Sequence, residues 1–124
     1  NGDINNLHNV QTAMIQSGAQ GVMIGRASQG RPWILGQVGD FLSNRKIRET
    51  PTVRKIKEIM LTHLEDMLTC YGSNGIRLAR KHIAWYSHGM PGSASLRDVA
   101  NNTQNANIVF EAVQRFFDEQ IEAA

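Results

Sequence analysis

The sequence predicts a mostly α-helical chain, in which a bundle of about four helices over residues 52–124 follows the tail of a β-α-β unit. Two observations predict this fold. Apolar residues recur every three to four positions from Thr52 almost to the end, which is the period of an α-helix. Ahead of them, the run GVMIG at residues 21–25 is short, apolar and bounded by glycines, which is typical of a buried strand.

The first 43 residues have the pattern helix, strand, loop, helix. The first helix is expected from Asn5 to Ser17, capped by Asp3 or by Asn5 itself. The second is expected from Pro32 to about Ser43, with Trp33, Ile34, Val38 and Phe41 facing inward. A single buried strand needs neighbours on both edges. We therefore expect this chain to be a piece of a longer protein.

Residues 44–51 are polar, charged and closed by a proline, so they are interpreted as a linker. Four helices are expected after it, at residues 52–70, 76–88, 95–102 and 105–121. Thr52 is expected to cap the first of them, and Ser93 or Ser95 the third. The stripe expected to be buried in the last helix contains Ile108, Val109, Val113, Phe116 and Phe117.

The composition excludes several classes of site. The one cysteine, Cys70, allows no disulfide framework and no Cys/His zinc spacing, so no metal is expected. Cys70 itself is interpreted as a small core residue at a helix end. No apolar run approaches the ~20 residues of a membrane span, and a reducing cytoplasm fits this cysteine usage.

Charge is unevenly distributed along the chain. No acidic residue occurs between Asp66 and Asp98, and that interval holds four cations, at Arg77, Arg80, Lys81 and Arg97. The sequence therefore predicts a positive surface suited to an anionic partner.

A second candidate site lies near the start. Asn1-Gly2-Asp3 falls where a strand ends and a helix begins, and Gly25-Arg26 follows the next strand. Glycine lets a backbone approach an anion, helix N-termini present N–H groups to it, and arginine adds a fixed positive charge. A phosphate site is one interpretation, and two tight glycine turns are the other.

Three segments carry a family resemblance that extends over essentially the whole chain. NGDI, GVMIGRASQGRPWI and RLARKHIAWY are similar to segments of the bacterial flavin-dependent tRNA-dihydrouridine synthases. The resemblance implies a (β/α)8 TIM barrel that holds FMN, followed by a helical domain that helps bind tRNA. It implies reduction of uridine in tRNA to 5,6-dihydrouridine, with NADPH restoring the reduced flavin. Residues 1–43 would be the last strand-helix steps of the barrel, and residues 52–124 the tRNA-binding domain.

The resemblance also implies site residues. Asn1, Gly2, Asp3, Gly25 and Arg26 would hold the phosphate and ribityl end of FMN. The family's catalytic cysteine is expected upstream, and Cys70 is not its counterpart. No catalytic residue is therefore assigned, and this piece is expected to be inactive alone.

The predicted RNA surface comprises Arg77, Arg80, Lys81, His82 and Arg97. For His82 the alternative is a partly buried, hydrogen-bonded histidine. For Trp85 core packing is favoured over stacking on an RNA base. The cations Arg54, Lys55 and Lys57 are interpreted as a solvated face, with RNA contact as the alternative.

Two other functions remain open at this point. One is a helical RNA-binding module without catalysis, which would not need a Gly-Arg phosphate loop. The other is a piece of a different FMN barrel oxidoreductase that acts on a small molecule, which would not need a basic helical tail.

Overall fold

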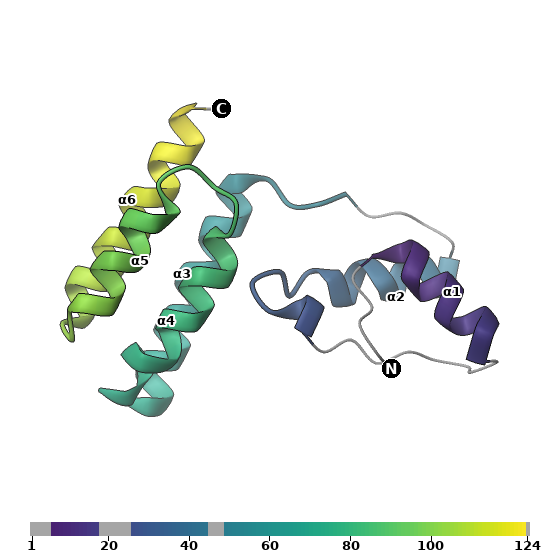
Figure 1. Cartoon of the computed structure of the whole chain (residues 1–124), viewed down its shortest axis with the longest axis horizontal. Coiled ribbons are helices and arrows are strands. Elements are labelled where there is room, and N and C mark those ends of the chain that lie inside the picture. Colours follow the sequence, from purple (N-terminus) through teal and green to yellow (C-terminus); the bar gives the residue numbers. More distant parts are fainter. Residues whose placement is uncertain (1–5, 18–25, 45–48, 124) are drawn as a thin grey trace. The chain divides into compact units, whose positions relative to one another are not determined.

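The computed structural model describes residues 6–17, 26–44 and 49–123, and the chain divides into two compact units, Asn1–Thr50 and Pro51–Ala124. In the described ranges every regular element is helical, as Figure 1 shows. The prediction of a mostly α-helical chain is therefore confirmed. The predicted strand at residues 21–25 lies outside the described residues. None of the described helices is long and apolar enough to cross a membrane.

The first unit contains α1 (Leu7–Ser17), a 3-10 turn η1 (Arg26–Ser28) and α2 (Ile34–Asn44). Its small core is formed by Val10, Ile34 and Val38. The side-chain oxygen of Asn6 accepts a hydrogen bond from the Asn9 amide at 2.8 Å, which caps α1. The predicted caps, Asp3 and Asn5, lie outside the described residues.

The second helix begins two residues later than predicted. Pro32 and Trp33 form a turn, in which the Ile34 amide donates to the Arg31 carbonyl at 3.0 Å. Ile34 and Val38 are buried as predicted, and Phe41 is half-buried and packs against their core. Trp33 is half-buried.

The second unit is a bundle of four helices: α3 (Val53–Tyr71), α4 (Asn74–Ser87), α5 (Ser93–Asn102) and α6 (Ala106–Ala123). Helix α3 packs against α4 and α6, and α5 packs against the same two helices. Most of the core comes from the apolar stripes of α3, α4 and α6. The largest side chains that are fully buried there are Phe117, Met60, Leu64, Ile83, Val109 and Val113.

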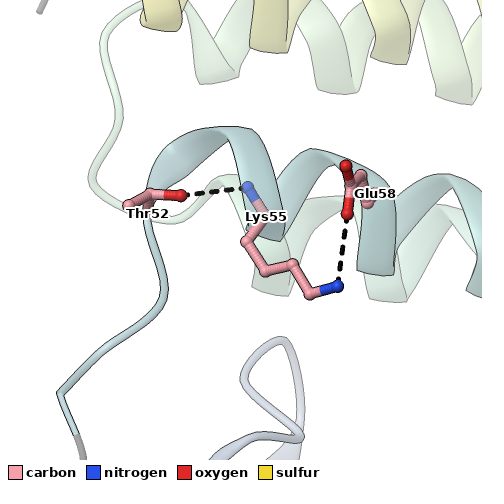
Figure 2. Close-up of polar contacts among 3 residues, drawn as sticks. All are labelled: Thr52, Lys55 and Glu58. Atoms are coloured by element: carbon pink, nitrogen blue, oxygen red, sulfur yellow. Dashed lines mark hydrogen bonds and ion pairs between the residues drawn. The ribbon is translucent and has the colours of Figure 1, made fainter.

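The caps of these helices differ in kind. The Thr52 hydroxyl accepts a hydrogen bond from the Lys55 amide at 3.2 Å, so the predicted cap of α3 is confirmed (Figure 2). The prediction that Ser93 or Ser95 caps α5 is wrong. The cap position is Gly92, at φ +85°, and no side chain bonds to the first turn. Glycine is favoured there because the left-handed conformation crowds a Cβ atom.

Two predicted core residues are at the surface. Ile108 is 47% exposed because it precedes Val109 by one position, which turns it about 100° away from the stripe that faces the bundle. Cys70 is exposed as well. The buried stripe of α3 ends at Met67, so the last turn of that helix extends beyond the core.

Candidate nucleic-acid interface

The outer face of α4 is positively charged. Arg77 and Lys81 are exposed on it, and no carboxylate occurs in the sequence between Asp66 and Asp98. The buried residues Ile76, Ala79 and Ile83 hold the opposite face against the bundle. The helical period therefore directs the two cations outward, where they can reach a ligand.

Arg80 has a different role from Arg77 and Lys81. Its Nε donates to the Ala100 carbonyl at 3.0 Å, and its Nη2 donates to the Thr103 carbonyl at 3.3 Å. Carbonyls at a helix C-terminus lack intrahelical partners and carry partial negative charge. Arg80 therefore joins α4 to the end of α5, and an RNA contact from it stays a prediction.

A polar cavity of about 160 Å³ lies at the start of α4. Arg77, Arg80 and Gln104 are among the residues that line it. Among the residues that the structure describes, none that lines it is acidic; the other lining residues are Ser73, Asn74 and Ile76. The cavity extends the positive surface of α4 to the end of α5.

His82 belongs to a cluster of rings between α3 and α4. Its ring centroid lies 4.5 Å from that of His63 and 5.1 Å from that of Trp85. The pKa of His82 is lowered by burial and then by the charge of His63. Its Nδ1 atom is buried and finds no hydrogen-bond partner among the described residues. The alternative of a hydrogen-bonded histidine is therefore wrong for this atom, and the neutral ring is favoured.

Sequence reasoning did not single out His63. Its Nδ1 atom lies 3.2 Å from the Tyr86 hydroxyl, so it connects α3 to α4. Burial raises the pKa of Tyr86 to about 12, which keeps the hydroxyl protonated. The only sequence signal for His63 is its place beside the buried Leu64, on the edge of the α3 stripe.

Two other predicted site residues, Arg97 and Arg26, lie in the described ranges. Arg97 is half-buried on α5. Arg26 is exposed at the start of η1, where its carbonyl accepts a hydrogen bond from the Gln29 amide at 3.1 Å. The other predicted FMN contacts, Asn1, Gly2, Asp3 and Gly25, lie outside the described residues.

The second basic face, on α3, is partly neutralised. Lys55 Nζ lies 3.2 Å from Glu58 Oε2 (Figure 2), and Lys57 forms an ion pair with Asp118 on α6. Arg54 is exposed. No group of three or more metal-binding side chains occurs in the ranges that the structure describes.

Comparison with known proteins decides the family. The family model described as "Dihydrouridine synthase (Dus)" matches residues 1–121. The chain belongs to the dihydrouridine synthase family. A tRNA-dihydrouridine synthase B from Xanthomonas axonopodis pv. citri (strain 306) is 38% identical over 122 residues, which are 98% of this chain and 37% of the relative. A probable tRNA-dihydrouridine synthase from Rickettsia conorii (strain ATCC VR-613 / Malish 7) is 36% identical over 123 residues, which are 98% of this chain and 37% of the relative.

The resemblance to dihydrouridine synthases is thereby confirmed, and the chain spans little more than a third of the length of the curated relatives it matches. The match extends over both compact units. A helical RNA-binding module alone would not account for residues 1–50, and a different family of FMN barrels would not give this match.

Proposed function

We propose that this chain is part of a flavin-dependent tRNA-dihydrouridine synthase and supplies its tRNA-binding helical domain together with part of its FMN phosphate site. The whole enzyme would reduce uridine in tRNA to 5,6-dihydrouridine, with NADPH as the reductant of the flavin. Family membership supports the reaction. A tRNA substrate and a single free cysteine fit a reducing cytoplasm.

The observation that carries the tRNA-binding role is the outer face of α4. Arg77 and Lys81 are exposed there on a helix that contains no carboxylate. Cations held on one rigid helix can neutralise successive phosphates and release their counterions, which favours nucleic-acid binding without base specificity. Arg97 and the guanidinium of Arg80 would add positive charge at the edge of this surface.

The basic face of α3 is the weaker candidate. Lys55 and Lys57 each have an acidic partner within reach, so binding a phosphate there would compete with an existing ion pair. Arg77 and Lys81 have no such acidic neighbour on their own helix. The cations of α4 should therefore attract RNA more strongly than the cations of α3.

The FMN part of the proposal rests on the residue types near the start of the chain. A guanidinium at Arg26, following a glycine at residue 25, suits a phosphate group. FMN, when bound, would supply the hydride that reduces the uracil ring. The residues of this chain would hold only its phosphate and ribityl end. We propose that the 124 residues alone are inactive, since the one cysteine, Cys70, belongs to a helix of the bundle, whereas the resemblance implies a catalytic cysteine upstream of this chain.

A pair of matched double variants tests the tRNA-binding role. Arg77→Ala/Lys81→Ala removes two cations from α4, and Arg54→Ala/Lys55→Ala removes two cations from α3. Both change the net charge equally, and all four residues are exposed. Filter binding of tRNA at two salt concentrations should show the larger loss of affinity for the α4 pair. Equal losses, or none, would remove α4 from the interface.

A further inference from the structure

Trp85 is a partly exposed aromatic residue on the positive face of α4. Its side chain is 36% exposed, whereas the next residue, Tyr86, is 4% exposed and belongs to the core. The expectation that Trp85 packs in the interior is therefore wrong in part: most of the residue is covered, and 36% of its surface stays open to solvent. The helical period explains the difference, because successive positions point about 100° apart.

One neighbour that holds the indole in place is His82. The His82 ring meets it nearly at right angles, at 89° and 5.1 Å between centroids. The His82 ring in turn packs against the ring of His63 on α3, with 4.5 Å between the two ring centroids. A ring fixed in this way loses little rotational freedom when a ligand binds, so less of the interaction energy is lost to ordering.

The neighbours of Trp85 along α4 are cationic or apolar. Lys81, one helical turn before it, is exposed, and Leu78, a further turn back, is 42% exposed. Residues four apart on a helix have Cβ atoms about 5–6 Å apart. Lys81 and Trp85 therefore lie side by side on one face of α4. The flexible lysine stem lets the ammonium group reach the phosphate of a nucleotide whose base meets the indole.

We infer that Trp85 binds an unpaired RNA base by stacking, with Lys81 at the phosphate of the same or the adjacent nucleotide. This inference rests on the proposed tRNA-binding role and goes further, because it requires a base that is splayed out of its helix. Bases within a duplex are stacked on one another and offer no face to the indole, whereas bases in loops can stack on aromatic side chains. The positive charge around Trp85 favours this occupant over an apolar protein surface.

Fluorescence can test the stacking directly. In a Trp33→Phe background Trp85 is the one remaining indole, since the chain has two tryptophans. The probe is an unstructured RNA of about ten nucleotides, compared with the same RNA annealed to its complement. We expect the single strand to quench the emission of Trp85 and the duplex to leave it almost unchanged.

Three variants in the same background separate stacking from charge. Trp85→Ala should weaken binding of the single strand by roughly 5- to 100-fold, as expected for loss of one stacked base. Trp85→Phe keeps an aromatic face and should retain most of the affinity, and its circular dichroism checks that the bundle is intact. Leu78→Ala is the matched control, because it removes an exposed apolar side chain of the same helix and should change little.

The possible failures can be told apart. If RNA binds in a salt-dependent way but neither quenches Trp85 nor depends on it, the stacking inference is overturned and the phosphate role of α4 stands. If Leu78→Ala weakens binding as much as Trp85→Ala does, the loss is not specific to the indole, and the stacking inference is again overturned. If no RNA binds at low salt, the tRNA-binding role fails, and the stacking inference fails with it.

Discussion

Gly75 on α4 lies against the backbone of Met67 on α3, so closely that a Cβ atom added to the glycine would be 2.6 Å from the Met67 carbonyl oxygen. No side-chain rotation relieves such a contact, because both groups belong to the backbone. Replacing Gly75 by alanine should force the helices apart and lower the free energy of unfolding by about 1–3 kcal/mol. Urea denaturation followed by circular dichroism measures the change.

Gly39→Ala is the control for that variant. Gly39 also lies within a helix, but nothing approaches the position of its Cβ within 4 Å. Alanine should be neutral there, or stabilise by about 0.5–1 kcal/mol, because it restricts the unfolded chain. A Gly75→Ala protein as stable as wild type would contradict the close approach of α3 and α4.

Arg80 should contribute to stability more than to RNA binding. Arg80→Lys keeps the charge but cannot supply two donors in a fixed fork to the Ala100 and Thr103 carbonyls. We expect a loss of about 1–2 kcal/mol in the free energy of unfolding. Lys81→Arg, at the neighbouring exposed position, should change stability by less than about 0.5 kcal/mol. An Arg80→Lys protein as stable as wild type would show that the two hydrogen bonds make no net contribution to the free energy of unfolding.

His82 should make the bundle less stable in mild acid. Its pKa in the folded protein is lowered below the usual 6.5 by burial and by His63. As pH falls through about 6.5 the unfolded chain takes up a proton that the folded protein takes up only at lower pH. The folded state therefore keeps its full stability above this range and loses part of it as pH falls below 6.5.

The measurement compares wild type with His82→Gln. Urea midpoints at about pH 7.5 and about pH 5.5 bracket the usual titration range of histidine. The midpoint of the wild-type protein should fall more steeply between them than that of the variant. Parallel changes in the two proteins would mean that His82 is not the group responsible.

The salt dependence of tRNA binding should reveal how many phosphates α4 neutralises. Each phosphate that is no longer neutralised should lower the slope of log affinity against log salt concentration by roughly 0.7 to 0.9. Arg77→Ala/Lys81→Ala should therefore reduce the slope by about 1.4 to 1.8, if both residues touch phosphates. An unchanged slope with reduced affinity would point to altered folding, which circular dichroism of the same sample would detect.

Arg26 should matter for the cofactor in the whole enzyme. Arg26→Ala removes the charge proposed to pair with the FMN phosphate and should weaken FMN retention roughly 10- to 100-fold. The ratio of flavin to protein absorbance after purification measures this directly. Arg54→Ala, an exposed arginine of the helical unit, is the control and should keep its flavin. A full flavin complement in the Arg26→Ala enzyme would overturn the assignment.

Much of the bundle was predictable from the sequence alone. The periodicity from Thr52 onward placed four helices within a few residues of α3 to α6, and Val109, Val113, Phe116 and Phe117 were predicted and found in the core. The cap at Thr52 was predictable because it depends on one hydroxyl and one nearby amide. These features are local, so local sequence determines them.

Tertiary packing decided what individual side chains on those helices do. Arg77, Arg80 and Lys81 are similar cations in the sequence. The end of α5 nevertheless provides two carbonyl acceptors for Arg80, from Ala100 and Thr103, while Arg77 and Lys81 are exposed. Trp85 and Tyr86 are adjacent aromatic residues, but α3 covers Tyr86 and leaves part of Trp85 in solvent. Helical period determines the direction in which a side chain points. The group that the side chain contacts there belongs to another helix, which is distant in the sequence. A local sequence pattern does not specify how that helix packs.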